Sequence, residues 1–89
     1  MDKEIHKGPG IGRYSFSGFR KVMEDNGYNP VKIGDATRGE NWQVWKNNGT
    51  TVRYFSKTDL GSFPKVKVTA QGSEDGIADL ERILGITAS

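Results

Sequence analysis

The sequence predicts an α+β fold, a two-layer sandwich in which one helix, three or four antiparallel strands and a second helix follow in order. Two stretches, 16–26 and 73–84, repeat apolar residues at helical spacing, whereas residues 41–56 alternate apolar and polar side chains around an Asn-Gly step. Because each helix has one apolar stripe and the sheet has one apolar face, the two layers should bury these surfaces against each other.

The first 13 residues contain the run Gly8-Pro9-Gly10-Ile11-Gly12, which interrupts both helical and strand periodicity. We therefore expect residues 1–13 to be a flexible N-terminal arm and residues 14–89 to form a single α+β domain. A chain of 89 residues can build one hydrophobic core and is too short for two. The glycine-rich run lacks the Gly-Lys-Ser/Thr ending of a phosphate-binding loop, so we interpret it as a linker.

The first helix should span residues 16–26, with Ser15 or Ser17 as its N-cap. Gly27 supplies a left-handed stop at its C-terminal end. Four apolar residues at helical spacing make up the stripe that we expect to be buried: Phe16, Phe19, Val22 and Met23.

A short strand over 28–33 should follow this helix, and Pro30 indicates an edge position because proline cannot donate a hydrogen bond to a neighbouring strand. Residues 34–40 read as a polar loop. Strands over 41–46 and 50–56 should then form a hairpin, since an Asn-Gly step between two alternating segments is a strong hairpin signal.

The register of this hairpin has two alternatives. A two-residue turn would pair Trp45 with Val52 and Trp42 with Phe55, whereas a three-residue turn would place Gly49 in a left-handed bulge. We favour the three-residue turn because it gathers an apolar face: Trp42, Val44, Val52 and Tyr54. The other, mixed face would then carry Gln43, Trp45, Thr51, Arg53 and Phe55.

A last strand is expected over 63–71, where Lys and Val alternate, and Pro64 indicates an edge. Ser73 should cap the closing helix, with acidic residues in its first turn. Gly85 should end this helix, and Ile86 should fold back as the hydrophobic contact of the stop.

Three short pieces of the chain resemble the HicA-type toxin family, small proteins with a fold like that of double-stranded-RNA-binding domains. They are Gly27-Tyr28 at the end of the first helix, the Asn48-Gly49 turn, and the run Leu80-Glu81-Arg82-Ile83-Leu84-Gly85-Ile86. The resemblance covers roughly residues 16–86. It implies RNA as the ligand of the family and a histidine near the start of the second strand as its catalytic group.

The corresponding stretch of this chain, Gly39-Glu40-Asn41-Trp42, contains no histidine. The single histidine, His6, lies in the expected flexible arm, where a general base could not be held against a substrate. We therefore predict that the ribonuclease activity of the family is absent. The run Ser73-Glu74-Asp75 would repel phosphates at the start of the second helix, which disfavours duplex binding in the usual mode.

The sequence predicts no enzyme, no cofactor and no metal site. It contains no cysteine, and carboxylate pairs such as Glu24-Asp25 and Glu74-Asp75 occupy adjacent helical positions, which point in different directions. The serines have no well-placed base that could activate them. No segment approaches the roughly 20 apolar residues of a membrane span, and we expect a soluble, cytoplasmic protein with no membrane partner.

Charge is unevenly distributed along the chain. Residues 1–72 hold 12 basic and 7 acidic side chains, whereas residues 73–89 hold one basic and four acidic ones. Such a basic body attracts polyanions, although a moderate basic excess also occurs in proteins that bind none.

These observations leave two functions open. In the first, RNA or single-stranded DNA binds the mixed sheet face, where aromatic side chains stack on bases and cations contact phosphates. In the second, the same patch anchors a protein partner, as in a bacterial or phage regulator or inhibitor of the toxin–antitoxin or defence type. The binding residues predicted for either function are Gln43, Trp45, Lys46, Arg53, Phe55, Lys65 and Lys67. A third interpretation makes Trp45 and Phe55 a small second core under the N-terminal arm.

Overall fold

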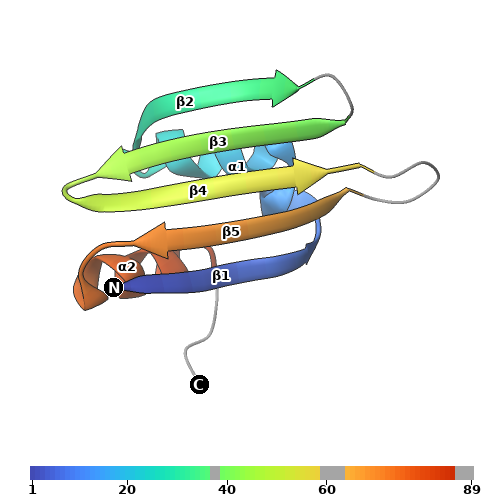
Figure 1. The fold of residues 1–89 in the computed structure, drawn as a ribbon. Coiled ribbons are helices and arrows are strands. Elements are labelled where there is room, and N and C mark those ends of the chain that lie inside the picture. Colours follow the sequence, from blue (N-terminus) through green and yellow to red (C-terminus); the bar gives the residue numbers. More distant parts are fainter. Residues whose placement is uncertain (37–38, 59–63, 86–89) are drawn as a thin grey trace.

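The computed structural model describes residues 1–36, 39–58 and 64–85, and in these residues five antiparallel strands form one sheet with two helices on one of its faces (Figure 1). The spatial order of the strands is β1-β5-β4-β3-β2. The strands are β1 (Asp2–Pro9), β2 (Asn29–Ala36), β3 (Glu40–Asn47), β4 (Thr50–Lys57) and β5 (Lys65–Gln71). The helices are the short 3-10 turn η1 (Gly12–Tyr14), α1 (Phe16–Asp25) and α2 (Glu74–Ile83). The predicted α+β class is confirmed, with one strand more than expected.

The additional strand is β1, and the prediction of a flexible arm is wrong for residues 2–9. This strand pairs antiparallel with β5, from Asp2 opposite Gln71 to Pro9 opposite Lys65. Its pairing partner is remote in the sequence, so the local glycine and proline content gave no sign of it. Because β1 covers the outer side of β5, the edge position inferred from Pro64 is also wrong.

Both helices have the predicted serine caps and glycine stops, and each ends one residue earlier than predicted, at Asp25 and at Ile83. The Ser15 hydroxyl accepts a hydrogen bond from the backbone N–H of Gly18, and Ser73 Oγ caps α2 in the same way, each over 3.1 Å. Gly27 and Gly85 follow the helices at φ values of +79° and +75°, the left-handed conformation of a helix stop. The contact predicted for Ile86 lies outside the described residues.

The hairpin of β3 and β4 has the two-residue turn, so the three-residue register was the wrong choice. Asn48 and Gly49 both have positive φ, +47° and +85°, as a turn requires when its twist matches that of the two strands. Trp45 therefore pairs with Val52, and Trp42 pairs with Phe55. A shift of one residue in pairing exchanges the two faces of one strand relative to the other.

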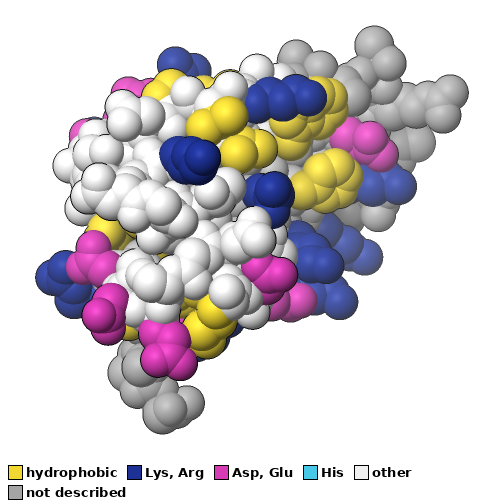
Figure 2. All heavy atoms as spheres, turned by 60° about the vertical axis from the view of Figure 1, so that its left-hand side comes forward, with side chains coloured by type: hydrophobic (Ala, Val, Ile, Leu, Met, Phe, Trp, Pro, Cys, Tyr) yellow, Lys and Arg dark blue, Asp and Glu magenta, His cyan; other side chains and the backbone are white. Residues whose placement is uncertain are grey.

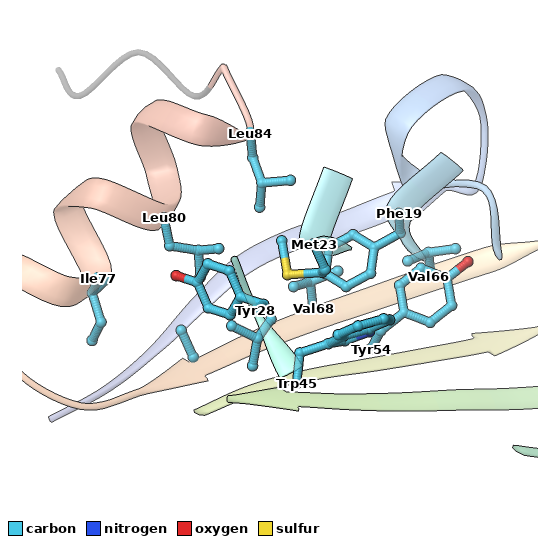
Figure 3. Packing of buried hydrophobic residues seen from close by; sticks show 12 residues of the cluster. Phe19, Met23, Tyr28, Trp45, Tyr54, Val66, Val68, Ile77, Leu80 and Leu84 are labelled. Carbon is cyan, nitrogen blue, oxygen red and sulfur yellow. The ribbon is translucent and has the colours of Figure 1, made fainter. Parts of the chain in front are cut away.

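The hydrophobic core lies between the two helices and the sheet face that they cover (Figure 3). Phe19 and Met23 of α1 contribute from the helix layer, and the Phe19 ring stacks on that of Tyr54 at a centroid distance of 4.9 Å. The buried hydrophobic residues are Phe19, Met23, Tyr28, Trp45, Val52, Tyr54, Val66, Val68, Ala70, Ile77, Leu80 and Leu84.

Candidate functional site

Trp45 does not lie on the exposed sheet face where the sequence predicted it. Its side chain is 0% exposed and packs toward the helices. The indole Nε1 donates a hydrogen bond to Gln43 Oε1 over 2.8 Å, and Gln43 Nε2 donates to the carbonyl oxygen of Phe16 at the start of α1 over 2.8 Å. Gln43 is also fully buried, so both residues are removed from the binding candidates. Because this core lies under α1 and not under the N-terminal segment, the interpretation of a second small core is wrong for Trp45.

Trp42 lies instead on the sheet face away from the helices, where its side chain is half-buried. It stands opposite Phe55, whose side chain is 41% exposed. The six-membered and five-membered rings of Trp42 lie over Gly34 of β2, where a Cβ atom would come within 3.1 Å of the indole. Lys32 Nζ lies 5.4 Å from the ring centroid of Trp42, a cation–π distance. The close approach to Gly34 and the cation–π contact with Lys32 therefore hold the indole in place beside Phe55.

Basic side chains surround this aromatic pair on the same sheet face. Residues opposite each other in antiparallel strands point to the same side, so the register places them without ambiguity. We call this surface the open face: Trp42, Val44 and Phe55, with the cations Lys7, Lys32, Lys46, Arg53, Lys57, Lys65 and Lys67. Figure 2 shows Lys and Arg side chains among hydrophobic ones toward the upper right, and several Asp and Glu side chains toward the lower left.

The predicted site residues on β4 and β5, together with Lys46 of β3, all belong to the open face. They are Lys46, Arg53, Phe55, Lys65 and Lys67. Trp42 was not predicted as a site residue because the wrong register put it in the core, and Lys32 was not predicted either. The sequence reasoning also missed Lys57, which simply continues the alternation of β4 by one step, and Lys7, which required knowledge of β1.

The ion pairs that the described residues form lie elsewhere on the molecule. Lys3 Nζ is 2.8 Å from Glu81 Oε1 and joins β1 to α2, while Arg20 and Glu24 pair within α1 and Arg82 and Asp79 within α2. Among the described residues, no cation of the open face takes part in an ion pair. The acidic residues that share this face by register are Asp2, Glu4 and Glu40, so cations outnumber carboxylates there.

One end of the open face is hollowed where β4, β5 and β1 lie side by side. The hollow has a volume of about 730 Å³. We call it the lysine hollow, and the described residues that line it are Lys7, Gly8, Pro9, Phe55, Lys57, Lys65, Val66 and Lys67. Four lysines and no carboxylate are among these residues, Phe55 belongs to the lining, and most of the surface of the hollow is apolar.

Burial raises the pKa of the phenol groups of Tyr14, Tyr28 and Tyr54 above their ordinary value of 10.0. The nearby negative charge of Asp79 raises the pKa of Tyr28 further. All three phenols belong to the core or pack against it, on the side of the helices. These groups therefore contribute to stability and do not form part of the open face.

His6 is placed by β1 and does not lie in a flexible arm. Its ring stacks on that of Tyr14 with the centroids 3.7 Å apart and the planes at 4°, and its Nε2 is 3.3 Å from the carbonyl oxygen of Pro9. It stands opposite Val68, a core residue, so it lies on the helix side of the sheet and not on the open face.

Comparison of the chain with models of protein families, with curated proteins and with solved structures found no match. The resemblance to HicA-type toxins stays a prediction. Within the described ranges, no group of three or more His, Asp or Glu side chains is arranged to hold a metal ion. None of the described helices has the length and apolar character needed to cross a membrane.

Proposed function

We propose that the protein binds single-stranded nucleic acid, RNA or DNA, on its open face. The observation that carries this proposal is the cross-strand pair of half-buried Trp42 and exposed Phe55, which lies among cations that form no ion pair with other described residues. A cytoplasmic location, where single-stranded RNA is abundant, is consistent with this ligand.

The chemistry of the open face suits a flexible polyanion with flat bases. Stacking of a base on an aromatic side chain contributes about 1 to 3 kcal/mol, and it tolerates any sequence because every base has a π face. Lysine and arginine around the rings add attraction to phosphates, which weakens steeply as salt rises. Since the indole of Trp42 is already held by Gly34 and Lys32, little side-chain entropy is lost when a base stacks on it.

The two layers of the molecule differ in charge in a way that favours this face. The first turn of α2 carries Glu74 and Asp75, and Asp79 follows one turn later. Phosphates are repelled there. A nucleic-acid strand would therefore be drawn to the open face and not to the N-terminus of α2.

The experiment is a titration with a fluorescently labelled, unstructured oligonucleotide, read by anisotropy at several salt concentrations. We expect Phe55→Ala to weaken binding roughly fivefold to a hundredfold, as the loss of one stacking contact implies. Ile11→Ala is the matched control, because Ile11 is 57% exposed and lies outside the open face. It should bind like the parent protein.

A second pair of variants tests the charge contribution. Lys67→Gln removes a cation of the open face, and Lys21→Gln removes one from the exposed side of α1 with the same change in net charge. Lys67→Gln should reduce the slope of log affinity against log salt by about 0.7, the value for one phosphate contact of a single strand. Lys21→Gln should leave the slope unchanged.

Absence of binding at roughly tens of micromolar protein in low salt would refute the proposal, because charge attraction is then strongest. The alternative is a protein partner, for which aromatic and arginine side chains are also preferred anchors. A partner that copurifies after nuclease treatment and is lost in Phe55→Ala would favour that function, provided that oligonucleotides do not bind.

A further inference from the structure

The lysine hollow differs from the remainder of the open face in how its charges are arranged. Lys57 stands opposite Lys65, Lys65 opposite Pro9, and Lys67 opposite Lys7, so four lysines occupy neighbouring positions of three adjacent strands. Opposite positions lie about 5 Å apart, and alternate positions of one strand about 7 Å apart. All four side chains are exposed, and directly opposed like charges destabilise a sheet.

Among the described residues that line the hollow, none is a carboxylate that could offset this repulsion. Among the described residues, the acidic side chain placed nearest by register is Glu40, which stands opposite Lys57 on the side away from the hollow. The other cations of the open face, Lys32, Lys46 and Arg53, stand opposite uncharged residues, Val44 or Thr51. An arrangement that is unfavourable by itself becomes favourable when an anion with more than one charge binds between the lysines.

The hollow also lies at the end of a continuous row of side chains. Trp42, Phe55, Lys67 and Lys7 are successive partners across β3, β4, β5 and β1, and β1 is the edge of the sheet. A strand whose bases stack on Trp42 and then on Phe55 is led directly into the lysine hollow. The 730 Å³ volume is in the range of pockets that hold a small molecule, which leaves room for one terminal nucleotide.

From these observations we propose that the lysine hollow binds the phosphate monoester at the end of a nucleic-acid strand, with the terminal base against Phe55. This inference rests on the proposed function of the open face. A terminal phosphate monoester carries a charge of about −1.5 to −2 at pH 7 and three acceptor oxygens. An internal phosphodiester carries a single negative charge, so a cluster of four lysines discriminates in favour of the end.

The test compares three oligonucleotides of one sequence with an internal label: one with a 5′-phosphate, one with a 3′-phosphate and one with hydroxyl groups at both ends. We expect one of the phosphorylated strands to bind about tenfold tighter than the unphosphorylated strand at pH 7.5. The advantage should shrink at pH 5, because the second pKa of a phosphate monoester is about 6. Adenosine monophosphate as competitor shows whether a free nucleotide takes the same place as the strand end.

Two double variants with equal changes in net charge provide the control. Lys7→Gln with Lys65→Gln removes two cations from the hollow, and it should abolish the advantage of the phosphorylated end. Lys46→Gln with Arg53→Gln removes two cations of the open face outside the hollow. It should weaken all three oligonucleotides by a similar factor and preserve the advantage. Circular dichroism should show that both variants are folded, because all four side chains are exposed.

Equal binding of all three oligonucleotides would overturn the inference about the strand end and leave the proposed function intact. The same holds if the advantage survives in the Lys7 and Lys65 double variant. If none of the oligonucleotides binds, the proposed function fails, and the inference fails with it.

Discussion

Exchange of each tryptophan for phenylalanine tests which indole belongs to the core. In Trp45→Phe, the smaller ring leaves a cavity of about 40 Å³, which at about 24 cal/mol per Å³ costs about 1 kcal/mol. The exchange also removes the donor to Gln43 Oε1, a bond of 2.8 Å between fully buried groups. An acceptor left without a partner in the core costs about 1 to 3 kcal/mol. The expected loss in the free energy of unfolding is therefore about 2 to 4 kcal/mol.

The same exchange at Trp42 should have a much smaller effect. The indole Nε1 of Trp42 has no hydrogen-bond partner among the described residues, so phenylalanine removes an N–H group that contributes no bond. The side chain is only partly buried, and phenylalanine keeps most of its contact with Gly34. We expect a change in the free energy of unfolding below about 1 kcal/mol.

The assay is unfolding in urea followed by far-ultraviolet circular dichroism, which does not depend on the tryptophans that are changed. With a slope of about 1 kcal/mol per molar urea for a protein of this size, Trp45→Phe should lower the midpoint by about 2 M or more. Trp42→Phe should lower it by less than about 1 M. Equal losses, or a larger loss for Trp42→Phe, would refute the assignment of the two indoles to opposite faces.

Three further changes follow from the structure. Burial raises the pKa of Tyr54 above 10.0, so its contribution to stability is complete below pH 10 and is lost as pH rises through the pKa of the folded state. Tyr54→Phe should therefore make the loss of stability at alkaline pH shallower. Urea unfolding from pH 8 to 11 measures this change. Gly76→Ala would bring a Cβ atom against Thr50 Oγ1, so it should lower the melting temperature although alanine is favoured over glycine in helices by about 1 kcal/mol. In a Thr50→Ala background, thermal unfolding should show that much of this loss of stability is removed. Gly34→Val should displace the Trp42 ring and weaken oligonucleotide binding severalfold; unchanged affinity would show that the position of this ring does not matter for binding.

The candidate site was predicted only in part, and the wrong placement of the two tryptophans has a single origin. With an odd spacing, Trp42 and Trp45 must face opposite sides of a strand, and the sequence established this much. Which of the two faces the core depended on the length of the turn. The three-residue turn gave the more uniformly apolar face, but Asn48 and Gly49 both adopt positive φ, and the two-residue turn results. A buried glutamine compensates for the less apolar face, because its amide satisfies the Trp45 indole and a carbonyl of α1.

The sequence by itself determined the two helices, their serine caps and glycine stops, and the existence of the hairpin. These features depend on interactions between residues a few positions apart, so the pattern of nearby side chains is sufficient. Only the tertiary structure decided that residues 2–9 form β1, and with it the position of Lys7 and the lysine hollow. The partner of β1 is β5, about 60 residues further along the chain, and no local pattern in a glycine-containing segment reports a pairing over that distance.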